Sequence, residues 1–199
     1  DHDDDALLME RADGPVSLAA MARDGADEAA SRILCEVAAR LHAPRDTPPP
    51  ELIPLETRFD ALFAAAGHGG LFAEAATVAR ALLDDPSDPR VLHGDLHHGN
   101  VLDAGPRGFL AIDPKRLHGE RAFDFANIFC NPDADVALAP GRLARQLRVV
   151  AEAADLEPRR LLRWIAAHAG LSAAWHVEDG SDPALALGVG ALALAELGR

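Results

Sequence analysis

The stretch VLHGDLHHGN, residues 91–100, places three histidines, one aspartate and one asparagine within ten positions. Gly94 and Gly99 lie inside it, and two glycines so close together argue against a helix at this point. The chain that follows, VLDAGPRGFLAIDP (residues 101–114), alternates short apolar runs with Gly, Asp and Pro. This composition is typical of short strands joined by tight loops. We therefore expect residues 91–114 to form a small strand-and-loop region that carries polar side chains.

Helical patterns flank this region on both sides. Residues 27–42 place Ile33, Val37 and Leu41 on one stripe at helical spacing, before a proline-rich segment ends the pattern. Further helices are predicted at about 56–66 and 71–83, and near Pro140, Pro158 and Pro183. The chain is therefore predicted to be mainly α with a few short strands, and TPPPEL (residues 47–52) is expected to join helices within one domain.

The composition limits the possible partners. With 199 residues, 49% of them hydrophobic, the chain can bury a core of its own. The formal net charge of −13 argues against nucleic acids and anionic membranes, because a phosphate-binding surface needs clustered Lys and Arg. A cationic small molecule would instead be attracted.

Cysteine usage and the apolar runs limit the compartment. Cys35 and Cys130 match neither a disulfide framework nor a paired zinc motif. No apolar run is long enough to span a bilayer, and residues 1–14 do not have the pattern of a signal peptide. We therefore expect a soluble, cytoplasmic protein, while the sequence leaves its oligomeric state open.

The histidine-rich stretch admits three interpretations. In the first, its histidines are solvated or hydrogen-bonded residues of an ordinary loop. In the second they bind a metal, but a His-Glu-x-x-His site needs a helix, and the adjacent His97 and His98 would point in different directions. The fragment GDLH is also reminiscent of metallophosphatases, yet the sequence has no upstream Asp-x-His after a strand and no later Gly-Asn-His.

The third interpretation explains more positions. His93, Asp95, Leu96 and Asn100 reproduce the kinase catalytic-loop pattern H-x-D-L-x-x-x-N, in which Asp accepts the proton of the substrate hydroxyl and Asn binds magnesium. A second magnesium ligand is needed after a following short strand, and Asp113 in FLAIDP stands there. Asp-Pro alone is a common turn dipeptide, but the two matches together favour phosphoryl transfer.

On these motifs the sequence resembles the aminoglycoside phosphotransferases, and within them the streptomycin kinase and hydroxyurea phosphotransferase group. The motifs are VLHGDLHHGNVL (91–102), AIDPKRLHGERAFDFANI (111–128) and LSAAWHVEDG (171–180), and the resemblance extends over nearly the whole chain. It implies that Asp95 is the catalytic base or orients the substrate, and that ATP and Mg²⁺ are the cofactors. The residues implied to hold magnesium are Asn100 and Asp113, and those implied to support the loop are His93 and Asp124.

The resemblance also implies that part of a kinase is absent from these 199 residues. No glycine-rich phosphate loop precedes the catalytic motif, and Lys115, the only lysine, follows Asp113 instead of lying on an earlier strand. We therefore expect residues 1–14 to be the hinge and last strand of a missing N-terminal lobe. Residues 15–199 would be the helical C-terminal catalytic and substrate-binding lobe of a protein-kinase-like fold.

In that register the first residues of the chain would contact the nucleotide. Met9 would face the adenine, and the backbone of Glu10 and Ala12 would receive its edge. A buried strand with no role in binding would explain the same apolar run, ALLME (residues 6–10), equally well.

The acceptor is the least constrained part of the prediction. Streptomycin carries guanidinium groups, which carboxylates bind through paired hydrogen bonds. Glu178 and Asp179 are the candidate ligands, although a solvated helix end before Gly180 explains them equally well. The sequence thus predicts a kinase for a hydroxyl of a cationic or polyhydroxyl small molecule, such as streptomycin. The alternatives are a hydroxyurea or metabolite kinase and a catalytically silent, ligand-binding remnant; the 199-residue chain alone is expected to be inactive.

Overall fold

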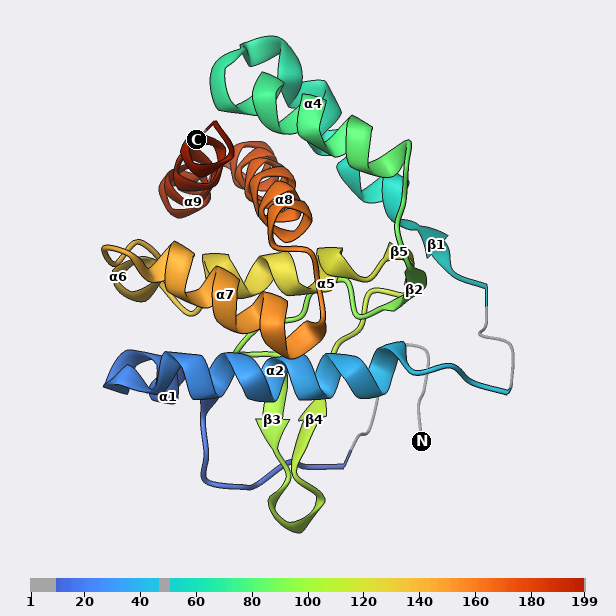
Figure 1. Ribbon diagram of the computed structural model, residues 1–199, viewed down its shortest axis with the longest axis vertical. Coiled ribbons are helices and arrows are strands. Elements are labelled where there is room, and N and C mark those ends of the chain that lie inside the picture. Colours follow the sequence, from blue (N-terminus) through green and yellow to red (C-terminus); the bar gives the residue numbers. More distant parts are fainter. Residues whose placement is uncertain (1–9, 47–50, 199) are drawn as a thin grey trace.

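Helix α8 (Pro158–Glu178) runs through the middle of the protein and is buried along most of its length. The structure is a computed structural model, and it describes residues 10–46 and 51–198. α8 begins at Pro158, as predicted, and Glu157 caps it by accepting hydrogen bonds from the backbone N–H groups of Arg159 and Arg160 (2.8 and 2.6 Å). The helices packed around α8 are α3 (Asp60–Ala65), α4 (Gly70–Leu83), α5 (Ala122–Ala126) and α9 (Ala184–Leu197) (Figure 1).

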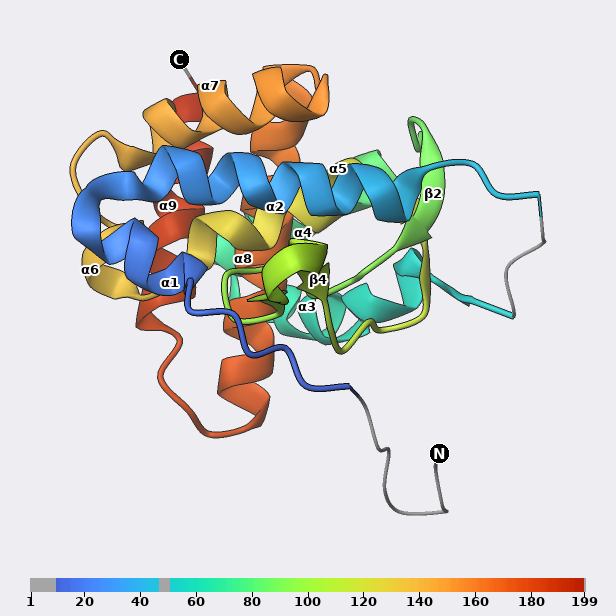
Figure 2. The ribbon, with the colours of Figure 1, turned by 90° about the horizontal axis from the view of Figure 1, so that it is seen from below.

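A second layer consists of α2 (Asp27–His42) and α7 (Arg142–Ala154), which lie side by side (Figures 1 and 2). The bounds of α2 confirm the predicted helix at 27–42. It is preceded by α1 (Leu18–Met21) and a π-helical turn, η1 (Ala22–Ala26), in which Gly25 has a φ of 90°. That left-handed glycine bends the chain between α1 and α2, because residues with a Cβ rarely adopt this conformation.

The other predicted helices differ from the structure only at their ends. The helix expected at 56–66 begins as a 3-10 turn, η2 (Leu55–Phe59), continues as α3 and ends as η3 (Ala66–His68). α4 confirms the helix at 71–83, while α7 begins two residues after Pro140 and α9 directly after Pro183. Two short elements complete the helical part: η5 (Asn127–Cys130) and α6 (Ala134–Ala137).

The strands gather around residues 91–114, as the sequence predicts. β2 (Pro89–Leu92) pairs antiparallel with β5 (Leu117–Glu120), and β1 (Ile53–Pro54) pairs parallel with β5. β3 (Val101–Asp103) and β4 (Phe109–Ala111) form a separate antiparallel hairpin with η4 (Gly105–Arg107) at its tip. In Figure 1 this hairpin extends away from the helices beneath α2.

The core lies between α8 and its neighbours. Trp164 on α8 is fully buried, with ring centroids 5.7 Å from Phe123 and 6.1 Å from Phe59. α4 comes so close to α8 that a Cβ on Gly170 would lie 2.4 Å from Cβ of Ala75, so this position requires glycine. Both cysteines are free and buried, and no helix in the described ranges is both long and apolar enough to cross a membrane.

His168 on α8 should make the fold sensitive to acid. Burial lowers the pKa of His168 to about 4, whereas a histidine in the unfolded chain has a pKa near 6.5. Between these values the unfolded state binds more protons, so the free energy of unfolding should fall as the pH falls from 6.5 to 4, by up to about 3 kcal/mol. His168→Leu should remove this part of the pH dependence in urea unfolding measured across that range.

Phe123→Leu provides the control, because Phe123 packs against His168 (5.6 Å between ring centroids) but carries no ionisable group. It should lower stability by a similar amount at every pH. An acid dependence that is the same in His168→Leu and in the parent protein would contradict the prediction.

Candidate active site

Residues 93–100 form a loop between β2 and β3, and this loop carries the predicted catalytic motif. Gly94 has a φ of 81°, and a Cβ there would lie 2.7 Å from Cδ1 of Leu117 and 3.0 Å from Cβ of Lys115. Only glycine combines this backbone conformation with such close packing against β5. This close contact fixes the position of the loop backbone immediately before Asp95.

Asp124 holds the backbone of the loop in place by accepting hydrogen bonds from it. It is buried on α5, and its Oδ1 accepts a hydrogen bond from the backbone N–H of Gly94 (2.7 Å). Its Oδ2 accepts hydrogen bonds from the backbone N–H of His93 (2.8 Å) and from Nε2 of His42 on α2 (2.8 Å). One buried carboxylate therefore joins α5, α2 and the start of the loop.

His93 links the loop to the strand that precedes Asp113. Its ring is buried, with Nε2 donating to the carbonyl of Ile112 (2.8 Å) and Nδ1 accepting from the backbone N–H of Asp95 (3.2 Å). The backbone N–H of Lys115 in turn donates to the carbonyl of His93 (2.7 Å). These bonds place the Asp113 segment directly beside the loop.

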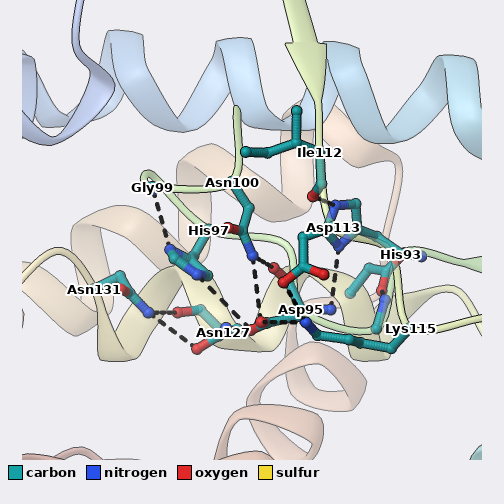
Figure 3. A network of polar contacts seen from close by, with 12 residues as sticks. His93, Asp95, His97, Gly99, Asn100, Ile112, Asp113, Lys115, Asn127 and Asn131 are labelled. Carbon is teal, nitrogen blue, oxygen red and sulfur yellow. Dashed lines mark hydrogen bonds and ion pairs between the residues drawn. The ribbon is translucent and has the colours of Figure 1, made fainter. Parts of the chain in front are cut away.

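Asp95 and Asn100 contact each other across the loop (Figure 3). Nδ2 of Asn100 donates to the carbonyl of Asp95 (2.9 Å) and to its Oδ2 (3.2 Å). Since the amide nitrogen is engaged with Asp95, Oδ1 of Asn100 is left to act as a ligand. The side chain of Asp95 is 32% exposed and accessible from outside.

Lys115 joins Asp95 to Asp113. Its Nζ forms a short ion pair with Oδ2 of Asp113 and lies 3.6 Å from Oδ2 of Asp95. The hydrogen bond from Lys115, followed by the charge of its ammonium group, holds the pKa of Asp113 below its ordinary value. Asp113 is therefore ionised at neutral pH, with its carboxylate next to that of Asp95 (Figure 3).

The donor set fits a magnesium ion. Asn100 and Asp113 offer an amide oxygen and an ionised carboxylate, both of which are hard ligands suited to Mg²⁺. Within the described part of the chain, no group of three or more His, Cys, Asp or Glu could hold a metal. A sparse set is nevertheless usual for Mg²⁺, which keeps several waters and takes the rest of its ligands from substrate phosphates.

The acceptor-side candidates lie at the surface. Glu178 ends α8 and Asp179 follows it as the C-cap; both are exposed, and their side chains form no ion pair within the described residues. Closer to Asp95, the guanidinium carbon of Arg58 lies 4.5 Å from the ring centroid of Trp175. Burial lowers the pKa of Arg58, and the charge of Asp95 opposes that shift. Arg58 therefore lies close enough to Asp95 for their charges to interact.

Two of the three predicted nucleotide-binding residues, Glu10 and Ala12, belong to a described segment that borders the β3–β4 hairpin. Met9 lies outside the described residues, whereas Glu10 and Ala12 belong to an irregular segment. The carboxylate of Glu10 pairs with Arg107 at the hairpin tip (2.9 Å). Farther along, the backbone N–H groups of Gly14 and Val16 donate to the carbonyl and carboxylate of Asp103 (2.9 and 3.0 Å). The segment thus runs beside the hairpin that connects Asn100 to Asp113.

Comparison with known proteins identifies the family. Residues 1–180 match the family model described as "Aminoglycoside/hydroxyurea antibiotic resistance kinase". The chain belongs to this family. It is 56% identical over 180 residues to a streptomycin 3''-kinase of Klebsiella pneumoniae, covering 88% of this chain and 68% of that protein. It is 31% identical over 204 residues to a streptomycin 6-kinase of Streptomyces glaucescens, covering 92% of this chain and 64% of that protein.

A third relative corresponds to the hydroxyurea part of the family description. The hydroxyurea phosphotransferase of Kitasatospora aureofaciens is 31% identical over 117 residues, which is 59% of this chain and 33% of that protein. Membership of the resistance kinase family places the chain among the phosphotransferases of antibiotic resistance. The chain spans about two thirds of the length of the streptomycin kinases it matches.

Several residues of this candidate site were not predicted as functional. They are Arg58, His97, Lys115, Asn127 and Asn131. Nδ2 of Asn127 donates to Oδ1 of Asp95 (2.9 Å), and Nε2 of His97 lies 3.8 Å from the same oxygen. A compositional signal was present: the chain has one lysine and three asparagines, all in this cluster.

Asp124→Asn should loosen the loop. The variant replaces one acceptor oxygen by an NH₂ donor that faces an existing donor, so at least one of three buried hydrogen bonds is lost. We expect the free energy of unfolding to fall by about 2–4 kcal/mol, as measured by urea unfolding. Asp84→Asn, on an exposed aspartate at the end of α4, should change it by less than about 0.5 kcal/mol. Equal effects of the two substitutions would rule out the supporting role of Asp124.

Proposed function

We propose that the full-length protein is an ATP- and Mg²⁺-dependent phosphotransferase whose acceptor is a hydroxyl of a streptomycin-type aminoglycoside. The observation that carries the proposal is the convergence of Asp95, Asn100 and Asp113 on adjacent loops, joined by Lys115. The 56% identity to a protein named streptomycin 3''-kinase supports the choice of acceptor. The net charge of −13 also favours a cationic substrate.

Asp95 is assigned to the acceptor. A carboxylate offers about four lone-pair positions, and the direct hydrogen bonds from Asn100 and Asn127 use one on each oxygen of Asp95. The remaining positions are sufficient to accept a hydrogen bond from a substrate hydroxyl and, as phosphoryl transfer proceeds, its proton. His93 and Asp124 act indirectly, by accepting hydrogen bonds from the backbone N–H groups of residues 93–95, which lead up to and include Asp95.

Asn100 and Asp113 are assigned to the metal and the nucleotide phosphates. Mg²⁺, when bound, neutralises charge on the transferring phosphoryl group. Oδ1 of Asn100 and the carboxylate of Asp113 would hold the ion, and Lys115 would contribute a further positive charge beside them. Phosphoryl transfer depends mainly on positioning and charge stabilisation, and these residues supply both.

The lobe assignment forms part of the same proposal. We assign residues 15–199 to the C-terminal lobe of a protein-kinase-like fold and residues 1–14 to the hinge, with Met9 and the backbone of Glu10 and Ala12 as adenine contacts. The greater length of the streptomycin kinases supports this assignment, as does the absence of a glycine-rich phosphate loop from the sequence. Glu178 and Asp179 are proposed to bind cationic groups of the acceptor.

Hydroxyurea is the second candidate acceptor, favoured by the 31% identity to a hydroxyurea phosphotransferase. A coupled ADP-release assay on the full-length protein, with streptomycin and hydroxyurea offered separately, distinguishes the two candidates. Acceptor-dependent ADP release with streptomycin supports the first. Release with hydroxyurea alone supports the second, and release with neither would favour a metabolite kinase or a catalytically silent lobe.

Asp95→Asn should abolish most turnover while leaving nucleotide binding nearly intact. The carboxylate acts on the acceptor hydroxyl, so we expect kcat of the full-length protein to fall by about 10²–10⁴-fold, with the Kd for ATP within about twofold. Asp113→Ala should instead weaken Mg²⁺-dependent ATP binding as well, which titration calorimetry with and without Mg²⁺ measures. Asp84→Asn serves as the charge-matched control. An unchanged kcat in Asp95→Asn would show that another group acts on the acceptor hydroxyl.

Residues 1–199 alone should fold but turn over ATP slower than the full-length protein by orders of magnitude. Under the lobe assignment, residues 1–199 do not include the phosphate-covering loop and its lysine, on which phosphoryl transfer depends. Circular dichroism tests folding, and the ADP-release assay on both proteins tests activity. Robust acceptor-dependent turnover by residues 1–199 would refute the lobe assignment.

A further inference from the structure

One helical turn carries two residues that support the position of Asp95. Asp124 lies in α5 and Asn127 begins η5, three residues later, so the two side chains share a face of the helix. Asp124 accepts from the backbone of the loop, whereas Nδ2 of Asn127 donates to Oδ1 of Asp95 itself (2.9 Å). The turn therefore fixes the position of the loop through one residue and can fix the direction of the Asp95 carboxylate through the other.

The orientation of the Asn127 amide is determined by its neighbour. Oδ1 of Asn127 accepts a hydrogen bond from Nδ2 of Asn131 (3.0 Å), which also donates to the backbone carbonyl of Asn127 (3.0 Å). An amide whose oxygen is engaged in this way can present only its NH₂ group on the other side. Asn127 thus meets Asp95 as a donor, as Figure 3 shows.

Asn131 is in turn anchored in the core. Its backbone carbonyl accepts from Nη2 of Arg142 (3.0 Å), a guanidinium that is only 2% exposed. The same guanidinium donates to the carbonyl of Phe129 (3.2 Å) and binds both oxygens of Asp27 on α2 (2.8 and 3.0 Å). A continuous series of hydrogen bonds therefore runs from a buried ion pair between α2 and α7 to the carboxylate of Asp95.

We propose that Asn127 is a positioning residue for the phosphoryl-transfer reaction, aiming the carboxylate of Asp95 at the acceptor hydroxyl while Asn131 and Arg142 hold its amide in place. The inference rests on the proposed function in assigning Asp95 to the acceptor. Without Asn127, Oδ1 of Asp95 would accept no hydrogen bond and would keep only the 3.8 Å approach of Nε2 of His97, whereas the contacts of Asn100 and Lys115 are both on Oδ2. The carboxylate could then turn about its last side-chain bond, and small displacements at a reacting centre reduce rates steeply.

Asn127→Leu tests the proposal in the full-length protein. The substitution keeps a similar volume and removes the donor, so kcat should fall about 10–100-fold, with the KM for ATP within about twofold. Asn131→Leu should cause a smaller loss, because it releases the Asn127 amide without removing it. Ile128→Val is the matched control: it reduces packing in the same turn at a fully buried side chain and should leave kcat unchanged. A drop with Ile128→Val equal to that with Asn127→Leu would overturn the proposal.

A double substitution separates positioning from a merely structural role. If Asn127 acts through Asp95, then Asn127→Leu in an Asp95→Asn background should reduce the residual rate by no more than about twofold. A structural role would reduce the rate by the same factor in both backgrounds. Full multiplicativity of the two losses would therefore refute the proposal.

A stability measurement distinguishes failure of this inference from failure of the proposed function. Asn127→Leu and Asp95→Ala are compared, singly and together, by their shifts in Tm. Shifts that do not add show that the two side chains interact, whatever reaction the protein catalyses. Additive shifts overturn the proposal. If the shifts are non-additive but the parent protein has no kinase activity, only the assigned reaction is overturned, and the contact between Asn127 and Asp95 is established.

Discussion

The candidate site depends on the buried carboxylate of Asp124. A buried anion is stable only when hydrogen bonds replace its lost hydration, and Asp124 obtains three: from the backbone of His93, the backbone of Gly94 and the ring of His42. These donors come from two different parts of the chain, so the carboxylate joins α2 to the loop while remaining on α5. The position of Asp95 relative to the helical core follows from this single group.

The strain of the site is concentrated on the opposite side of the loop. Asp113 and Arg116 have φ values of 60° and 56°, a conformation that side chains with a Cβ adopt rarely. The backbone between them is held by the bond from Lys115 to the carbonyl of His93 (2.7 Å) and by the bond from Ile53 to the carbonyl of Arg116 (2.8 Å). These contacts turn the chain sharply after β4, which brings Asp113 and Lys115 back toward Asp95. A relaxed strand continuing from β4 would carry them away.

The parts of the fold that follow from local pattern were accessible from the sequence. The stripe of Ile33, Val37 and Leu41 predicted α2, and the mixture of Gly, Asp and Pro in residues 91–114 predicted short strands and loops, because both patterns express the geometry of neighbouring residues. The spacing of the motifs also predicted that Asp95, Asn100 and Asp113 belong to one site. The π-helical turn before α2 was not predicted, since it bends at Gly25 (φ 90°), and a glycine in the sequence does not reveal which of its accessible backbone conformations it adopts.

The partners of the Asp95 carboxylate were harder to predict. Asn127 and Asp95 are 32 residues apart, and no periodicity relates a side chain in a loop to one on a later helix. The position of Lys115 after Asp113 excludes it as the strand lysine of kinases, and no local pattern assigns it another role. In a chain so rich in arginine and alanine, the rare polar residues were more informative than the frequent ones. The available signal for Asn127 was that all three asparagines of the chain lie within residues 100–131.

The two oxygens of Asp95 divide the site into two sides. Oδ2 faces Asn100 and Lys115, the side assigned to metal and phosphates, whereas Oδ1 faces Asn127 and His97. Relatives in the family carry names that refer to different acceptors, although phosphoryl transfer makes the same demands in each. Under the proposed function, the choice of acceptor should therefore depend on residues outside the Oδ2 side, such as Arg58, which stacks on Trp175 and interacts with the charge of Asp95. Substitutions of such residues can change the substrate without disturbing the Oδ2 side, because Asn127 and its hydrogen-bonded neighbours hold the carboxylate independently of the acceptor.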